Sequence, residues 1–413
     1  MSADGRFVAF VSSASNLVAG DRNKRGDLFV YDRMSGKMQR SDVGHYLIAE
    51  YGVTLSPDLR FVAFTDARPG SDCYDAFVYD RSTGKTEQVD LNRKGAPGAP
   101  AGNCAWGNVA LSPDGRFVAF SSASPDLVAG GAPTAHTQCP DDFMGCSGTD
   151  VFVRDRKTGT TERVSVSSSG GRANGDSFVS GISADGRLVY FSSKATNLTA
   201  DGKSGQFVRD RLTKTTRRLP TSFSPEARFA AFSVKYDAGD GRLPAAELYV
   251  YERATGKRTL VHVTKRGERA NARIKPVSIS ADGRYVVFLS DATNLDAPSA
   301  HATCPSPGGR GYDEEGQSFA ASPGARYLCS DLYVTDRTSG KTELVTANAN
   351  GKPAGHSSVV DSQPAFISAD GRYVAFTSTA KNLVPGRDTN RDPDVFLRDL
   401  RAHTTTLISA AAR

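Results

Sequence analysis

SPDGRFVAF, residues 112–120, is the stretch of this 413-residue chain that decides its fold. The segment RFVAF is rich in aromatic and β-branched residues, which predicts a strand, and the Asp-Gly step before it supplies the positive φ of a tight hairpin turn. The same phrase recurs with small changes at residues 2–10, 56–64, 183–191, 224–232, 280–288 and 368–376. Such self-similarity indicates a repeat protein.

A second phrase follows each copy of the first. It reads DVFVRDRKTGT at residues 150–160 and recurs at residues 27–37, 76–85, 206–215, 247–257, 331–341 and 394–404. A short apolar segment precedes most copies, such as NVAL at 108–111, and another follows, such as TERV at 161–164. Each repeat therefore contains four predicted strands, a to d, and no stretch has the period of a helix. The Asp-Arg step that ends strand c is present in nearly every repeat, so we expect it to stabilise the scaffold.

Seven repeats of four strands predict an all-β protein, a seven-bladed β-propeller of four-stranded antiparallel blades. We expect a single domain, residues 1–413, with blades at approximately 1–49, 50–107, 108–176, 177–219, 220–275, 276–363 and 364–413. Blade 1 lacks its innermost strand, because Ser2 already belongs to its first turn. We therefore expect a natural upstream segment before Met1 that includes a secretion signal.

The first phrase, S-x-D-G-x-x-[VI]-x-F, followed by a short strand that ends near Asp, resembles the TolB-like or WD40-like (PD40) propeller repeat. The resemblance covers nearly the whole chain and implies the propeller fold more than any particular activity. TolB itself is a periplasmic interaction module, so the resemblance implies an exported protein that binds a protein or a cell-envelope glycan. Some lyases of acidic polysaccharides also use TolB-like propellers. That implies the alternative of a carbohydrate-active enzyme, a polysaccharide lyase or hydrolase, with its site at the mouth of the central pore.

Composition argues against several other classes. The chain carries 51 Lys and Arg against 45 Asp and Glu, a net charge of +6. No apolar run approaches the ~20 residues of a membrane-spanning helix. There is no G-x-S-x-G nucleophile elbow and no Gly-rich phosphate-binding loop that opens a helix. We interpret the one local basic cluster, Lys265-Arg266…Arg269…Arg273, as a solvated loop and not as a nucleic-acid site. We expect a monomer that binds rather than catalyses, with no nucleic-acid partner, no membrane span and no required cofactor.

The predicted loops differ between the two ends of the blades. Every a–b and c–d connection is a tight turn. The long connections are the b–c loops at 121–149 and 290–330 and the d–a loops at 91–107, 167–176 and 346–363. In an antiparallel blade the b–c and d–a loops emerge at the same end. Function on a rigid scaffold is usually carried by elaborated loops, so we predict a binding face there. Drift of loop length on a tolerant surface is the alternative.

All six cysteines fall in the b–c and d–a connections at this face, with Cys73 just before strand c of blade 2. The economical disulfide pairing is Cys139–Cys146, Cys304–Cys329 and Cys73–Cys104. Six cysteines allow fifteen pairings, and three disulfides would indicate an oxidising compartment. We therefore expect a secreted, periplasmic or cell-surface protein. A zinc site built on the His-x-x-Cys steps that begin at His136 and His301 is the alternative, but no fourth ligand is evident.

Further candidate site residues lie in the same loops. The candidate ligand-binding aromatic residues are Trp106, Phe143, Tyr312 and Phe319. The histidines best placed for catalysis, if the protein is an enzyme, are His136, His301 and His356, with His262 more marginal. Aromatic and polar groups that converge on a propeller mouth suit a sugar or a peptide, although Trp106 could instead pack a loop onto a disulfide.

Two loops space oxygen ligands as calcium-binding loops do. The sets are Asp388, Asn390, Asp392 and Asp394 in blade 7 and, more thinly, Asp21, Asn23 and Asp27 in blade 1. No Glu closes either loop, and such residues also cap turns. A structural calcium ion is therefore the one cofactor that the sequence suggests.

Overall fold

The computed structural model describes most of the chain. The described residues are 1–21, 26–41, 53–67, 74–97, 109–129, 148–219, 228–236, 245–252, 255–264, 267–297, 303–305, 310–312, 318–320, 326–328, 331–348, 350–354, 365–384, 386 and 393–410. Within these ranges the secondary structure consists of strands, with no helix. The chain divides into two compact units, one of Met1–Val8, Tyr31–Lys37 and Ala227–Arg413, the other of Ala9–Val30 and Met38–Glu226. Each unit is described by itself.

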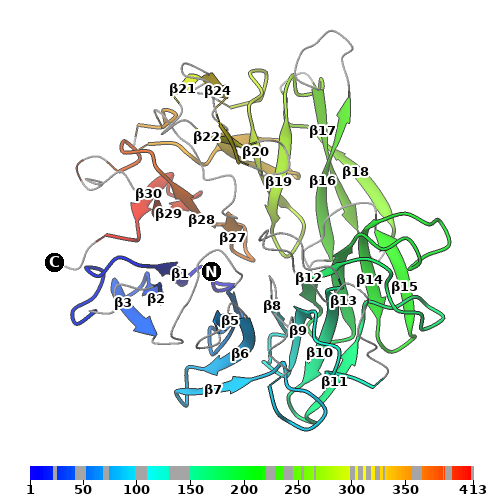
Figure 1. The fold of residues 1–413 in the computed structure, drawn as a ribbon. Helices are drawn as coiled ribbons and strands as arrows, with labels where there is room; N and C mark the ends of the chain where they lie inside the picture. Colours follow the sequence, from blue (N-terminus) through cyan, green and yellow to red (C-terminus); the bar gives the residue numbers. More distant parts are fainter. Residues whose placement is uncertain are drawn as a thin grey trace. The chain divides into compact units, whose positions relative to one another are not determined.

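Seven antiparallel sheets follow one another along the chain, and they are the blades of a seven-bladed β-propeller, as predicted (Figure 1). Blade 1 is β1 (Phe7–Ser12), β2 (Asp27–Asp32) and β3 (Lys37–Ser41); blade 2 is β4 (Thr54–Leu55), β5 (Phe61–Ala67), β6 (Tyr74–Asp80) and β7 (Lys85–Gln88); blade 3 is β8 (Val109–Leu111), β9 (Phe117–Ser122), β10 (Asp150–Asp155) and β11 (Thr160–Arg163). Blade 4 is β12 (Ser177–Ile182), β13 (Leu188–Ser193), β14 (Gly205–Asp210) and β15 (Thr215–Leu219); blade 5 is β16 (Phe229–Tyr236), β17 (Ala245–Glu252) and β18 (Lys257–Val261). Blade 6 is β19 (Ile274–Ile279), β20 (Tyr285–Ser290), β25 (Asp331–Asp336) and β26 (Thr342–Leu344); blade 7 is β27 (Phe366–Ile367), β28 (Tyr373–Ser378), β29 (Asp394–Asp399) and β30 (Thr404–Leu407).

Among the described residues the sheet of blade 1 has the order β1-β2-β3 and contains no strand before β1, as predicted. The long b–c loop of blade 6 contains two small sheets that the sequence did not predict. β21 (Thr303–Pro305) pairs with β24 (Arg326–Leu328), and β22 (Arg310–Tyr312) pairs with β23 (Ser318–Ala320). This loop therefore has secondary structure of its own.

A stacked aromatic pair lies in every blade, one ring on strand b and one on strand c. The pairs are Phe10–Phe29, Phe64–Phe77, Phe120–Phe152, Phe191–Phe207, Phe232–Tyr249, Phe288–Tyr333 and Phe376–Phe396, with ring centroids 5.5 to 5.9 Å apart. Such cross-strand pairs contribute about 0.5–1.5 kcal/mol each beyond the burial of their area. The aromatic residue that ends the first phrase and the one in the second phrase thus lie opposite each other in every blade.

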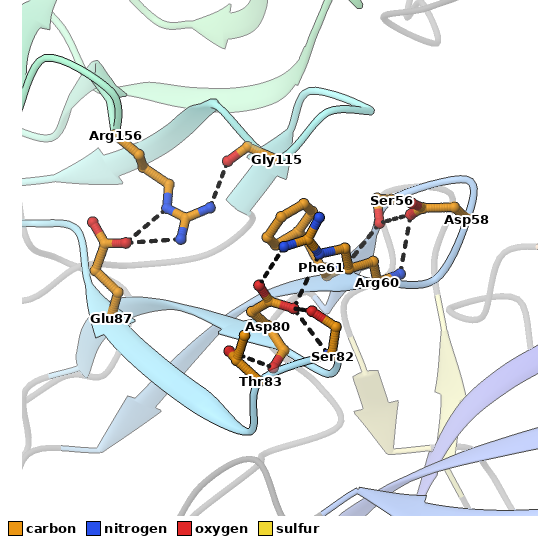
Figure 2. A network of polar contacts seen from close by, with 10 residues as sticks. All are labelled: Ser56, Asp58, Arg60, Phe61, Asp80, Ser82, Thr83, Glu87, Gly115 and Arg156. Carbon is orange, nitrogen blue, oxygen red and sulfur yellow. Dashed lines mark hydrogen bonds and ion pairs between the residues drawn. The ribbon is translucent and has the colours of Figure 1, made fainter.

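The a–b and c–d turns form what we call the turn end of a blade, and a polar network fills it. In blade 2 the Ser56 hydroxyl donates to Asp58 at 2.6 Å, and Asp58 accepts the backbone N–H of Arg60 at 3.0 Å (Figure 2). The Arg60 guanidinium then reaches Asp80 at the end of strand c, with Nη2 2.9 Å from Oδ2. The equivalent ion pair is present in all seven blades: Arg6–Asp32, Arg60–Asp80, Arg116–Asp155, Arg187–Asp210, Arg228–Glu252, Arg284–Asp336 and Arg372–Asp399. The acid of the recurring Asp-Arg step therefore stabilises the scaffold, as expected.

The arginine that follows this acid joins neighbouring blades. Arg156 of blade 3 donates to the Gly115 carbonyl of its own blade at 2.6 Å and to Glu87 of blade 2 at 2.7 Å. Its guanidinium also lies 5.3 Å from the centroid of the Phe61 ring of blade 2 (Figure 2). Arg211 of blade 4 makes the same set of contacts with blade 3. The Phe61 ring is also covered by Arg60, at 4.6 Å from its centroid, so two guanidinium groups contact this ring.

The glycine of each Asp-Gly turn receives the aromatic ring of the preceding blade. A Cβ on Gly186 would lie 2.2 Å from the ring of Phe117, and one on Gly115 would lie 2.3 Å from that of Phe61. In the other unit the same contact joins Phe229 with Gly283, Tyr285 with Gly371 and Tyr373 with Gly5. Leu59 and Ala227 replace the glycine in blades 2 and 5, and Leu59 keeps its positive φ of 58°.

Replacing Lys214 by glycine is expected to stabilise the protein. Lys214 occupies the glycine position of the c–d turn in blade 4, where its φ is +56°, while Gly84 and Gly159 adopt +68° and +69° in blades 2 and 3. A left-handed residue with a Cβ costs about 1 kcal/mol, and the Lys214 side chain is exposed. Urea unfolding should therefore show a gain of about 1 kcal/mol for Lys214→Gly. Lys157→Gly, in the same turn of blade 3 but outside the left-handed region, is the control and should lose stability; a loss in both variants would contradict the interpretation.

Candidate ligand-binding site

The b–c and d–a loops form the loop end of a blade, and a buried or half-buried acid marks it. The residue two positions before the paired aromatic ring of strand c is acidic in six blades: Asp27, Asp75, Asp150, Glu247, Asp331 and Asp394, with Gly205 in blade 4. In three blades a hydroxyl after strand d donates to this acid: Ser165 to Asp150 at 2.7 Å, Thr346 to Asp331 at 3.0 Å and Ser409 to Asp394 at 2.5 Å. The loop end thus has a repeated polar anchor, as the turn end does.

Arginines of the d–a loops add to this anchor in blades 3 and 5. Arg172 Nε lies 2.7 Å from Asp150, and Arg269 Nε lies 2.9 Å from Glu247. Each arginine begins an Arg-Ala-Asn step whose asparagine binds the next b–c turn. Asn174 donates to Thr196 at 3.1 Å, and Asn271 donates to Thr293 at 2.6 Å. The two loops are therefore held in the same way.

Blade 5 differs from blade 3 in what surrounds the acid. Glu247 accepts the hydroxyls of Tyr236 and Tyr249, both at 2.7 Å, in addition to Arg269. The Arg269 guanidinium lies 3.8 Å from the centroid of the Tyr236 ring. Its side chain is 54% exposed, whereas that of Arg172 is 24% exposed. The Tyr236–Glu247–Tyr249–Arg269 group, which we call the blade-5 cluster, is the more accessible of the two.

A shallow hollow adjoins the blade-5 cluster. Glu247, Leu260, His262, Gly267, Glu268 and Arg269 are among its lining residues. His262, Glu268 and Arg269 are exposed, so the hollow opens to solvent with polar groups at its rim.

Protonation in the blade-5 cluster is fixed at neutral pH. Hydrogen bonds from Tyr236, Tyr249 and Arg269 lower the pKa of Glu247 to about 2. The bond that Tyr236 donates to Glu247 raises the pKa of Tyr236 to about 12. A general acid or base works best with a pKa near the working pH, and these two groups lie far from it. Their arrangement suits a fixed binding surface better than proton transfer.

Most of the predicted site residues lie outside the described residues. These are Trp106, Phe143, His136, His301, His356, Asn23, Asp388, Asn390 and Asp392, together with Cys73, Cys104, Cys139, Cys146 and Cys329. Tyr312 and Phe319 belong to the paired strands β22 and β23, and Cys304 lies on β21. The binding residues, the disulfides and the catalytic histidines stay predictions.

The described members of the two calcium sets have protein partners. Arg40 Nη1 lies 3.0 Å from Asp21 and 3.5 Å from Asp27, and Asp394 accepts the Ser409 hydroxyl. Among the residues that the structure describes, no group of three His, Cys, Asp or Glu side chains is arranged to hold a metal ion. Calcium binding also stays a prediction.

The described part of the chain contains no helix long and apolar enough to span a membrane.

Sequence reasoning missed the blade-5 cluster. Tyr236 and Glu247 lie on strands b and c, not in the long loops where candidates were sought. Two signals were present: the Arg-Ala-Asn step shared by 172–174 and 269–271, and Glu247 where five blades have Asp.

Comparisons with known proteins identify the fold. The structure resembles an oligogalacturonate lyase in complex with manganese, with 13% identity over 98% of this chain and 87% of that one and a TM-score of 0.53. It also resembles an oligogalacturonate lyase from Vibrio parahaemolyticus, with 12% identity over 98% and 89% of the two chains and a TM-score of 0.52. TolB from Acinetobacter baumannii matches at 11% identity over 97% and 62%, with a TM-score of 0.39. No family model matches the sequence, and no curated protein matches it. At these identities the likeness extends to the β-propeller fold.

Proposed function

We propose that this protein is an exported β-propeller that binds a protein or a cell-envelope glycan through the loop ends of its blades. The observation that carries the proposal is the blade-5 cluster, in which Glu247 orients two tyrosines and a half-exposed arginine. Tyrosine and arginine are the side chains that most often anchor a ligand, because each offers a large flat surface and a polar tip. The proposal follows the general pattern of rigid scaffolds that carry function on their loops.

The alternative is a carbohydrate-active enzyme whose histidines lie in three different loops. The structural neighbours named as oligogalacturonate lyases suggest which substrates to include in a test, namely oligogalacturonates. Glu247 and Tyr236 do not suit such a role, because neither exchanges a proton near neutral pH.

Glycan arrays and cell-envelope fractions are the test, with product release followed in the same samples. For any ligand found, Arg269→Ala is expected to weaken binding at least tenfold, about 1.4 kcal/mol, because it removes the exposed cation of the blade-5 cluster. Arg172→Ala removes the equivalent arginine of blade 3 and should change affinity less than twofold, with thermal unfolding recorded for both variants. Turnover that disappears in the His136→Ala, His301→Ala or His356→Ala variants would refute a purely binding role.

A further inference from the structure

The sequence contains two Asn-Gly steps, and both lie in d–a loops. Asn174-Gly175 belongs to blade 3 and Asn350-Gly351 to blade 6, and both asparagines are exposed. Asparagine is one of the chemically labile residues of proteins. A glycine after it adds to this lability, because glycine has no side chain to hinder attack by its nitrogen. The two steps share their sequence and their exposure, so they can be compared by their contacts.

Hydrogen bonds hold the Asn174 side chain in place at both atoms of its amide. Its Oδ1 accepts the N–H of Thr196 at 2.8 Å, and its Nδ2 donates to the Thr196 hydroxyl at 3.1 Å. The N–H of Asn174 donates to Asn197 Oδ1 at 3.0 Å. Gly175 is also tightly packed, because a Cβ there would lie 2.9 Å from the backbone nitrogen of Ala195. A reaction between the Asn174 amide and the Gly175 nitrogen would have to break these contacts together.

The Asn350 side chain has no hydrogen-bond partner among the described residues, and only its backbone is held. Its N–H donates to Asn348 Oδ1 at 2.9 Å. Gly351 adopts a φ of +70°, and a Cβ there would have no atom within 4 Å. The Gly351 N–H donates to the Asn348 carbonyl at 2.9 Å, within the same tight turn. Local opening of this one turn is therefore enough to free both the Asn350 amide and the Gly351 nitrogen.

We propose that Asn350 is a site of spontaneous chemical modification, at which the side-chain amide is lost by ring closure with Gly351. The Gly351 nitrogen attacks Cγ of Asn350 and gives up its proton, the Cγ–Nδ2 bond breaks, and ammonia leaves a cyclic succinimide. Water then opens the succinimide at one of its two carbonyl groups, which gives aspartate or isoaspartate. The sequence of steps needs water alone and no oxidant or metal. The nitrogen attacks in its deprotonated form, so the rate rises with pH.

The modification changes the charge and the backbone length of the d–a loop of blade 6. Aspartate and isoaspartate both carry a negative charge where the amide is neutral, and isoaspartate also adds a carbon to the main chain. Asn348 Oδ1 accepts the N–H groups of Asn350 and Lys352, at 2.9 and 3.1 Å, and the longer chain cannot satisfy both. Ala347 lies at the base of the same loop, and its carbonyl accepts the buried Arg398 guanidinium of blade 7 at 3.4 Å. The inference goes beyond the proposed function, because it gives a slow chemical switch to the end of the blades where we propose that a ligand binds.

The test follows both Asn-Gly steps in one sample of the full chain, incubated at pH 8. Trypsin places them on separate peptides, residues 173–187 and 342–372. Mass spectrometry measures the conversion of each asparagine, fragmentation locates it, and a zero-time digest subtracts conversion during handling. We expect Asn350 to convert at least tenfold faster than Asn174, a difference of about 1.4 kcal/mol in the barrier. In urea the two rates should differ by less than roughly threefold, because the structure no longer protects Asn174.

The repeat supplies a matched control. Blade 3 has Ser169 at the turn position of Asn350, so Asn350→Ser should abolish the mass gain of peptide 342–372 and leave thermal unfolding unchanged.

Three results would contradict the inference. Conversion of Asn350 no faster than that of Asn174 in the folded protein would refute it outright. The same ratio of rates in folded and urea-unfolded protein would refute its structural basis, because the sequence alone would then set the difference. A rate that does not rise between pH 6 and pH 8 would exclude attack by the deprotonated nitrogen. The proposed function is unaffected by these results, since the screen of glycans and cell-envelope fractions tests it separately.

Discussion

Gly186→Ala is expected to lower the free energy of unfolding by about 3 kcal/mol or more, whereas Gly84→Ala should lower it by about 1 kcal/mol. The two glycines have the same backbone conformation, with φ of +69° and +68°. They differ in their neighbours: a Cβ on Gly186 would lie 2.2 Å from the Phe117 ring, and one on Gly84 would have no atom within 4 Å.

The difference between these two variants measures the contact between blades, because the backbone cost cancels. The Phe117 ring cannot easily retreat, since Arg116 and Arg211 cover it at 4.6 and 4.9 Å from its centroid. Overpacking of such a site costs about 1–3 kcal/mol in addition to the strain of the left-handed residue. Urea unfolding of the two variants, followed by fluorescence and by circular dichroism, gives both free energies. Equal losses would show that the ring moves freely, and the contact would not then contribute to stability.

Asp90→Ser should stabilise the protein by about 3 kcal/mol at pH 8 and have little effect near pH 4. Asp90 follows the buried Val89, whose N–H bonds the carbonyl of Ala76, just as Ser165 follows Val164 and Thr346 follows Val345. Blade 2 thus has a carboxyl group where blades 3, 6 and 7 have a hydroxyl that donates to the first acid of strand c. Burial, with a further contribution from the charge of Asp75, raises the pKa of Asp90 to about 7.

The pH dependence follows from the direction of this shift. Between about pH 4 and pH 7 the folded protein keeps a proton on Asp90 that the unfolded chain has lost, so stability falls as pH rises through this range. Above pH 7 the folded protein also loses the proton, and Asp90 then carries a buried charge close enough to Asp75 for the two to repel. A shift of about 3 pH units corresponds to roughly 4 kcal/mol at most, at 1.36 kcal/mol per unit. Serine, or asparagine in Asp90→Asn, supplies a neutral donor and removes this cost.

Thermal and urea unfolding from pH 4 to pH 8 provide the measurement. The gain from Asp90→Ser should grow with pH and level off near pH 8, and Asp90→Asn should follow the same curve. Asp201→Asn, at an exposed aspartate of blade 4, is the control and should show no such gain. A gain in stability that is the same at all pH values would mean that the pKa of Asp90 is not raised in the folded protein.

The fold could be predicted from the sequence because its determinants are local and repeated. The Asp-Gly turn, the Phe that ends the first phrase and the Asp-Arg step each recur at fixed spacing. The turn forms as predicted, the Phe belongs to a stacked ring pair, and the Asp of the Asp-Arg step forms an ion pair. The site was harder to predict, because its members come from strands b, c and a d–a loop that meet only in the folded blade. Tyr236 and Arg269 are 33 positions apart, and neither belongs to a motif with known chemistry.

Residues that depart from the repeat were the most informative, and the prediction did not use them fully. Asp90, Lys214 and Glu247 each stand where other blades have a hydroxyl, a glycine or an aspartate. The repeat identifies these positions in the sequence, but their effects depend on the packing around them. Burial raises the pKa of Asp90, Lys214 lies in a strained turn, and Glu247 accepts hydrogen bonds from two tyrosines.

The recurring ion pairs and ring contacts at the turn ends have a consequence for how such a protein can change. Blade-to-blade fastening uses residues within tight turns, where an inserted residue would break several contacts at once. The segments that join strands b and c can vary in length, as the paired strands inside the blade 6 loop illustrate. A foreign peptide grafted between β9 and β10 should therefore be carried without loss of folding, which makes this architecture a natural display frame for new recognition sequences.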